Sequence, residues 1–255
     1  MAWFKKNISS QLFWLLIFFG IFGAVSLSMS LHARRGDSGE FVVLRNEHRY
    51  TNLTDALREP LRVEILDLYG QGRTEFPVEI LEFKNLLFLD LGHNPITSLP
   101  PEISQLKQLE KLYLTQTRLT SLPEELKQLK QLRILYLTDS PITGLPESLG
   151  PHFQLQELVA DGTSITELPR DIHQLYGLTK LSLNGTPIFY LPETIGGLRR
   201  LLVLQLNDTP LTQLPTTLTQ LEYLKQVSIV NTPIDSETVR TLRRNMPDTA
   251  FLGAE

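Results

Sequence analysis

The 255-residue chain contains no cysteine. This absence excludes disulfide bonds, thiolate zinc sites, a cysteine nucleophile and an acylated lipoprotein cysteine. Secreted animal domains often depend on disulfides, so a chain without them is more typical of a bacterial protein or of a fold stabilised by its own repeats. A large charge of either sign is also missing, since the formal net charge is −4 and the basic residues are scattered. We therefore expect no nucleic-acid partner.

Signatures of catalysis are equally scarce. The five histidines are dispersed, with no HExxH motif and no pair at metal-ligand spacing. The stretch RGDSGE (Arg35 to Glu40) echoes the nucleophile motif of trypsin-like proteases, but the surrounding sequence does not predict the β-barrel that the motif requires. The stretch GQG (Gly70 to Gly72) lacks the third glycine of a dinucleotide loop. We expect no enzyme, no cofactor and no metal site.

One long apolar run, Leu12 to Leu31, follows Lys5 and Lys6 near the N-terminus. Its length approaches the ~20 residues of a membrane-spanning helix, while Ser28-Met29-Ser30 is acceptable as a signal-peptide cleavage site. We predict an N-terminal hydrophobic helix that is an uncleaved membrane anchor or a cleaved signal peptide. The repeats would then be membrane-anchored and extracytoplasmic, or secreted or periplasmic after cleavage.

The rest of the chain is dominated by a period of 23 residues. Seven segments align without gaps, and an eighth, truncated copy begins at Leu224; the seven start at Val63, Leu86, Leu109, Leu132, Leu155, Leu178 and Leu201. In each copy the strand residues alternate, so Leu89 and Leu91 point to one side while Phe88 and Asp90 point to the other. One such strand cannot bury its leucines alone, and stacking the copies gives a continuous core.

The unit LLFLDLGHNPITSLPPEISQLKQ (Leu86 to Gln108) resembles the leucine-rich repeat family in its bacterial-type form, LxxLxLxx(N/T)x(I/L)xxLPxxIxxLxx. The resemblance covers about residues 63–231. It implies a short α/β solenoid with a parallel β-sheet on its concave face, and a non-catalytic binding module. The family usually has Asn between strand and return; here that position is mostly Thr, with Asn94, Ser140 and Gln71 in the other copies. Threonine makes fewer hydrogen bonds, so we expect a weaker turn.

The sequence therefore predicts five segments. Residues 1–32 are the signal peptide or anchor, 33–47 a polar linker, 48–62 an N-terminal cap, 63–223 the seven repeats, and 224–255 a truncated repeat with a C-terminal cap. The first cap is predicted as a helix around Asp55 to Arg58. The second is a helix N-capped by Asp235 or Ser236, with Val239, Leu242 and Met246 on its inner face. Together His152 and Ala160, which replace core leucines, predict an adapted joint in the middle of the solenoid. For His152, a locally distorted return segment and a pH-sensitive or ligand-contacting role both remain open.

Two groups of residues are candidates for binding another protein. Aromatic and aliphatic side chains gather on the concave face beside carboxylates: Phe88, Asp90, Tyr113, Ile134, Tyr136, Val159 and Asp161. On the lateral turn, Phe189-Tyr190 interrupts a column of threonines. An alternative to a protein partner is cell-wall glycan or another saccharide, recognised by Tyr113 and Tyr136. Strand propensity and local packing would explain the same residues without any partner.

Overall fold

The computed structural model describes residues 33–35, 41–43, 48–147 and 154–253. The chain divides into two compact units, residues 1–46 and 47–255. In the first unit, within the predicted linker, β1 (Ala33–Arg35) and β2 (Phe41–Val43) form an antiparallel pair. The predicted N-terminal helix and His152 lie outside the described residues. Among the residues that are described, no helix has the length and hydrophobicity needed to span a membrane.

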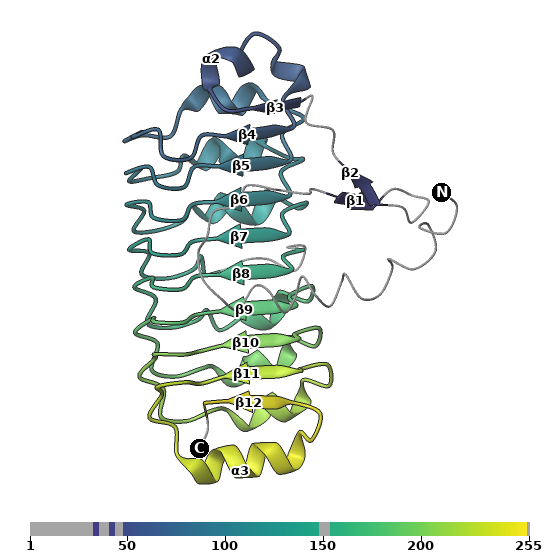
Figure 1. The fold of residues 1–255 in the computed structure, drawn as a ribbon, viewed down its shortest axis with the longest axis vertical. Coiled ribbons are helices and arrows are strands. Elements are labelled where there is room, and N and C mark those ends of the chain that lie inside the picture. Colours follow the sequence, from purple (N-terminus) through teal and green to yellow (C-terminus); the bar gives the residue numbers. More distant parts are fainter. Residues whose placement is uncertain (1–32, 36–40, 44–47, 148–153, 254–255) are drawn as a thin grey trace, which may run out of the picture. The chain divides into compact units, whose positions relative to one another are not determined.

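The second unit is built on a parallel sheet whose ten strands follow chain order, as Figure 1 shows. Consecutive repeat strands pair without a register shift, so residues 23 apart are direct neighbours, as in the pair Leu112 and Leu135. This confirms the parallel sheet predicted from the period. The strands are β3 (Arg49–Tyr50), β4 (Ile65–Asp67), β5 (Phe88–Asp90), β6 (Lys111–Tyr113), β7 (Ile134–Tyr136), β8 (Glu157–Val159), β9 (Lys180–Ser182), β10 (Val203–Gln205), β11 (Gln226–Ser228) and β12 (Ala250–Leu252).

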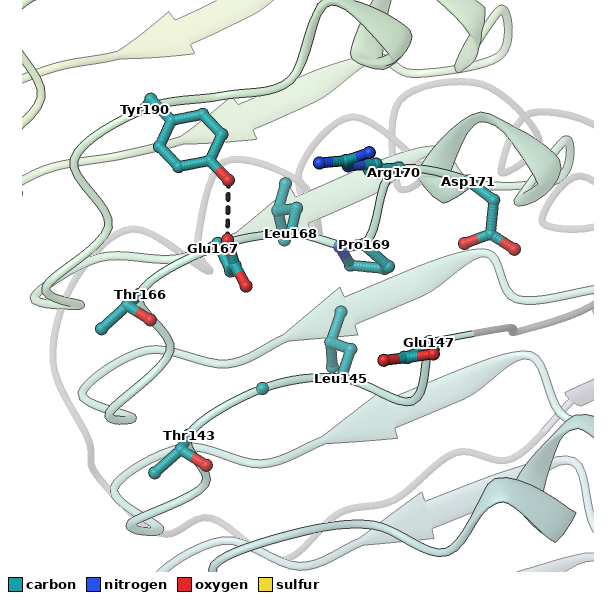
Figure 2. Close-up of a pocket in the computed structure, with 11 residues that line it drawn as sticks. Thr143, Leu145, Glu147, Thr166, Glu167, Leu168, Pro169, Arg170, Asp171 and Tyr190 are labelled. Carbon is teal, nitrogen blue, oxygen red and sulfur yellow. Dashed lines mark hydrogen bonds between the residues drawn. The ribbon is translucent and has the colours of Figure 1, made fainter.

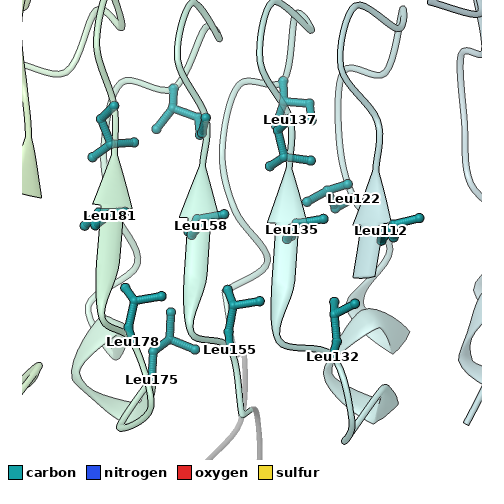
Figure 3. Packing of buried hydrophobic residues seen from close by; sticks show 14 of the residues in the cluster. Leu112, Leu122, Leu132, Leu135, Leu137, Leu155, Leu158, Leu175, Leu178 and Leu181 are labelled. Atoms are coloured by element: carbon teal, nitrogen blue, oxygen red, sulfur yellow. The ribbon is translucent and has the colours of Figure 1, made fainter. Parts of the chain in front are cut away.

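The core consists of the leucines that alternate inward from each strand, together with residues of the returning segments. Leu112, Leu135, Leu158 and Leu181 stack in register behind β6 to β9 and are at most 1% exposed (Figure 3). Ala160 is fully buried in the same cluster. Each fully buried leucine side chain contributes about 1.5–3 kcal/mol relative to leaving it in water, so the stack stabilises itself copy by copy.

The returning segments are 3-10 helices, not α-helices. Five of them begin directly after the repeat's proline, whose fixed φ and missing N–H suit the residue before a helical turn. Each 3-10 helix places one residue, such as Ile103 or Leu126, in the hydrophobic core. The segments are η4 (Val78–Glu82), η5 (Pro101–Gln105), η6 (Glu124–Gln128), η7 (Ile172–Gln174), η8 (Glu193–Gly197) and η9 (Thr216–Gln220).

Both ends of the sheet carry one more strand than the repeats predict. At the first end β3 pairs with β4, followed by α2 (Leu53–Ala56) and the 3-10 helix η3 (Pro60–Arg62). The helix was predicted around Asp55 to Arg58, which is wrong by two residues because the Asn52 side chain accepts a hydrogen bond from Asp55 N (2.8 Å) and starts it earlier.

At the other end α3 (Ser236–Asn245) is N-capped by Asp235 and buries Val239 and Leu242, as predicted, and Met246 directly after the helix is buried as well. The chain then adds β12, parallel to β11.

Besides Gly72 in the first of these turns, one repeat position has left-handed backbone in the turn after each strand from β4 to β11. Its φ lies between 54° and 67° in every copy, at positions 23 apart: Gly70, His93, Gln116, Asp139, Gly162, Gly185, Asp208 and Asn231. Glycine adopts this conformation without cost, and the other residue types at this position adopt it only with some strain. The Asn184-Gly185 pair is therefore part of the repeating turn.

The next residue, at the position of Asn94, stabilises the turn through side-chain hydrogen bonds. The Asn94 amide donates to the carbonyl oxygens of Leu68 (2.8 Å), Leu91 (2.9 Å) and Gly92 (3.1 Å), and its Oδ1 accepts from Arg73 N (3.0 Å). Thr209 instead donates one hydrogen bond, to Leu206 O within its own turn (2.8 Å). The threonines at positions 163, 186 and 232 behave alike, so the prediction of fewer bonds is confirmed.

Candidate functional site

The outer strand face is the side of the sheet opposite the core, and the register arranges its side chains in two columns. One column begins Ile65, Phe88, Lys111, Ile134 and Glu157; the other begins Asp67, Asp90, Tyr113, Tyr136 and Val159. Six of the seven predicted concave-face residues therefore lie on four adjacent strands, β5 to β8, and form one patch. The seventh, Asp161, follows β8 in the turn.

Three aromatic rings form the centre of this patch. Tyr113 and Tyr136 stack with centroids 4.6 Å apart and planes at 10°. Phe88 contacts Tyr113 edge to face, with centroids 5.0 Å apart and planes at 76°. Such pairs contribute about 0.5–1.5 kcal/mol each beyond the area they bury. The rings hold one another, and Phe88 is only 7% exposed while the tyrosines are half-buried.

Carboxylates surround the rings. Tyr136 donates its hydroxyl hydrogen to Glu157 Oε2 (3.0 Å), and burial together with the charge of Glu157 raises the tyrosine pKa. Burial likewise raises the pKa of Tyr113 to about 12. At Asp90, burial raises the pKa to about 6 despite the hydrogen bond from Gly92 N (2.8 Å). Both tyrosines are therefore neutral hydrogen-bonding groups at physiological pH, and Asp90 titrates close to it.

Charged neighbours extend the patch toward the first strand. Arg49 on β3 forms an ion pair with Asp67 (Nη2 to Oδ2, 2.6 Å), one strand before Asp90. Lys111 lies beside the rings, and burial lowers its pKa. Arg49 and Glu157 are functional candidates that the sequence prediction did not select. A signal for Glu157 existed, because it stands one copy after Ile134 in an outward column.

Two predicted residues have local structural partners. The Asp161 carboxylate Oδ1 accepts hydrogen bonds from Ser182 Oγ (2.6 Å) and Asn184 N (2.8 Å), so it anchors the next turn. Val159 is only 9% exposed beside Tyr136. These contacts place both residues at the border of the patch, not at its centre.

Phe189 and Tyr190 lie on a different part of the repeat and are not joined to the aromatic patch. Their rings contact each other with centroids 5.0 Å apart, and they are 58% and 41% exposed. Tyr190 donates its hydroxyl hydrogen to Glu167 Oε2 (2.7 Å), as Figure 2 shows. The same tyrosine lines a pocket of about 480 Å³, the lateral pocket, with Thr143, Gly144, Leu145, Glu147, Thr166, Glu167, Leu168, Pro169, Arg170 and Asp171. The sequence prediction did not identify this pocket.

Within the described residues, no group of three or more His, Asp or Glu side chains is arranged to hold a metal ion. The sites that the structure does present are therefore a stacked aromatic patch with carboxylates and a polar lateral pocket. Both can bind by shape and hydrogen bonding.

Two family profiles match the chain. One, described as a leucine-rich repeat region, matches residues 147–245, and another, described as a leucine rich repeat, matches residues 84–142. A search of curated protein sequences gives no match.

Solved structures share the fold. The plant peptide hormone receptor RGFR1 in complex with RGF2 is 25% identical, with a TM-score of 0.65 over 87% of this chain and 36% of the receptor. An internalin (InlF) from Listeria monocytogenes is 17% identical, with a TM-score of 0.65 over 75% of this chain and 54% of its own. The functional domain of InlJ from the same bacterium is 22% identical, with a TM-score of 0.63 over 81% and 42%. This chain thus spans about a third to a half of their lengths.

Proposed function

Because the chain belongs to the leucine-rich repeat family, we propose that its repeats form a non-catalytic module that binds another protein outside the cytoplasmic membrane. The partner would dock on the outer strand face, centred on Phe88, Tyr113 and Tyr136. The observation that carries this proposal is the stacked ring pair with its fixed hydroxyl group. Rigid aromatic side chains beside hydrogen-bonding groups are the usual centres of protein interfaces. The plant receptor, solved with RGF2, supports a polypeptide ligand.

The ring geometry favours a protein over a saccharide. A sugar ring packs on an exposed aromatic face. One face of Tyr113 is covered by Tyr136, and Phe88 contacts the same tyrosine in an edge-to-face pair. The outer strand face therefore presents ring edges and hydroxyl groups, which suit hydrogen bonds to a polypeptide. Saccharide recognition remains the second candidate and is one outcome of the test below.

For the N-terminal segment we propose that residues 1–32 carry the repeats to the membrane, as anchor or signal peptide. The support is the apolar run from Leu12 to Leu31. The intact mass and N-terminal residue of the mature protein, measured in membrane and soluble fractions, decide between the two. Full-length protein in the membrane fraction identifies an anchor, and a new N-terminus near Ser30 identifies a cleaved signal.

Binding is tested with the double variant Tyr113→Ala/Tyr136→Ala. We expect capture of a defined protein partner by the unaltered chain and a loss of affinity of roughly 30-fold or more in the variant, the effect of removing an interface centre. Tyr176→Ala/Tyr223→Ala is the matched control, because these tyrosines are exposed (56% and 58%) and lie off the strand face. An equal loss of affinity in both double variants would refute the assignment of the binding site to the outer strand face.

Two further assays separate the other function classes. Retention on insoluble cell wall that soluble sugar competes away, and that the Tyr113→Ala/Tyr136→Ala change abolishes, would establish saccharide recognition instead. Hydrolase activity that copurifies with the chain at constant specific activity across preparations would overturn the non-catalytic assignment. Both assays use the full-length protein, so one preparation serves all three.

A further inference from the structure

The lateral pocket arises where one repeating column of residues changes. Position 144 belongs to a column that reads Glu75, Ser98, Ser121, Gly144, Glu167, Tyr190 and Gln213, so glycine there is followed by two large side chains. A side chain added at Gly144 would meet nothing within 4 Å, and no left-handed backbone requires glycine there. The glycine therefore opens a space on the surface that Glu167 and Tyr190 border.

The electrostatics of the pocket favour a cation. Among the described residues, its lining contains three carboxylates, Glu147, Glu167 and Asp171, and one guanidinium, Arg170, which together carry a net charge of −2. Among the described residues none of the four side chains forms an ion pair. One oxygen of Asp171 is buried without any hydrogen-bond donor, which costs about 1–3 kcal/mol.

The aromatic pair adds an apolar border. Tyr190 is held by Glu167, and its ring supports Phe189, the most exposed aromatic residue of the described repeats together with Tyr223. A cation beside the tyrosine ring gains a further attraction from the ring face. The volume of about 480 Å³ lies within the range of sites that enclose a ligand group.

We propose that the lateral pocket is a second binding site, which takes the guanidinium or ammonium group of a basic side chain on a polypeptide while a neighbouring apolar side chain packs on Phe189. The carboxylates of Glu147, Glu167 and Asp171 give the pocket its attraction for the basic group, and Tyr190 forms part of its wall. Arg170 carries the one positive charge in the described lining and repels the cation of the ligand. The site is separate from the outer strand face and does not depend on the function proposed for that face.

The test uses the full-length chain and three probes: the blocked tripeptide leucine-arginine-leucine, the same peptide with norleucine in place of arginine, and agmatine, a free guanidinium. Affinity is measured by calorimetry. Binding is located by fluorine NMR of protein labelled with 3-fluorotyrosine, in which Tyr190→Phe identifies the Tyr190 signal. We expect the arginine peptide to shift that signal and to bind at least five-fold more tightly than the norleucine peptide, as one charge pair allows. Agmatine should bind more weakly than the arginine peptide.

The variants should change the affinity for the arginine peptide in opposite directions. Glu167→Gln and Asp171→Asn should each weaken binding of the arginine peptide about five-fold, and Arg170→Gln should strengthen it by a similar factor. Gly144→Trp should fill the pocket and abolish binding. Ser98→Trp, at the equivalent exposed position two copies earlier, is the control and should change nothing.

Several results would overturn the proposal: equal affinity for the two peptides, an unmoved Tyr190 signal, weaker binding in Arg170→Gln, or the same effect of tryptophan at positions 98 and 144. If agmatine binds as tightly as the arginine peptide, the claim that the ligand is a polypeptide is refuted. Thermal unfolding of each variant checks its fold, and Arg170→Gln predicts a gain that misfolding cannot produce. The Tyr113→Ala/Tyr136→Ala variant should bind the peptide normally, so failure of the strand-face proposal is recognised separately.

Discussion

Asn94 is the residue whose replacement tests the turn structure most directly. It is fully buried, and its amide joins two copies: Leu68 O belongs to the preceding turn, Leu91 O to its own, and Oδ1 accepts from Arg73 N of the preceding copy. Replacing it with alanine leaves these backbone groups without a partner. Asn94→Thr should keep the bond within its own turn and lose those to the neighbouring turn, as the threonine at position 209 shows.

The magnitudes follow from the bonds that each change removes. A hydrogen bond contributes about 0.5–1.5 kcal/mol, and a buried group left unpaired costs more. We expect Asn94→Ala to lower the free energy of unfolding by about 3 kcal/mol and Asn94→Thr by about 2 kcal/mol. Thr209→Val is the control; it removes one bond, from Thr209 Oγ1 to Leu206 O, and should cost about 1 kcal/mol.

Urea denaturation followed by circular dichroism measures the three losses, provided that the slope of the transition is unchanged. Stability in a solenoid is partly local, so hydrogen exchange at the Arg73 amide supplies a second measurement beside Asn94. That amide should exchange faster in both Asn94 variants and normally in Thr209→Val. Equal losses for Asn94→Thr and Thr209→Val, or an Arg73 amide that stays protected in Asn94→Ala, would refute the inter-turn role.

Two further predictions concern the turns and the strand face. Gln116→Gly should raise the free energy of unfolding by about 0.5 kcal/mol and Gly185→Ala should lower it by about 1 kcal/mol, because both positions have φ above 50° and only glycine is unstrained there; urea midpoints that move in the same direction would contradict this. Burial raises the pKa of Asp90 to about 6, above its usual value, so the folded state retains a proton that the unfolded state has lost, and stability falls as pH rises from about 4 to 6. Asp90→Asn should therefore stabilise the protein at pH 8 by on the order of 2 kcal/mol and make no difference at pH 4, and a gain that is constant between pH 4 and pH 8 would show that the charge is not responsible.

Much of the fold followed from the spacing of a few residue types. Leu89, Leu112 and Leu135 recur every 23 residues, and that interval alone predicted parallel strands, their register and the buried face. The C-terminal helix was predicted from Asp235 and the spacing of Val239 and Leu242. Strands β3 and β12 were missed because they lie outside the repeat and gain their hydrogen bonds only from the neighbouring strand.

The candidate site was predicted less completely. The columns of the strand face identified Tyr113 and Tyr136, since alternation fixes which side chains leave the core. Their stacking and the bond from Tyr136 to Glu157 could not be predicted, because ring orientation depends on packing between neighbouring strands. Asp161 was selected as a binding residue, and the structure gives it two hydrogen bonds to the next turn. No short sequence motif marks the lateral pocket.

The sequence by itself determined everything that repeats: the period, the inward leucines, the turn position that is Asn94 in one copy and threonine in most others, and the proline in each return. These features can be predicted from the sequence because every copy packs against its two neighbours in the same way. Only the tertiary structure decided what differs between copies. Gly144, Glu167 and Tyr190 are ordinary residues until stacking brings them together at intervals of 23, where one leaves a space and the other two form its wall. The effect of a residue that departs from the repeat therefore depends on the side chains that the neighbouring copies place beside it.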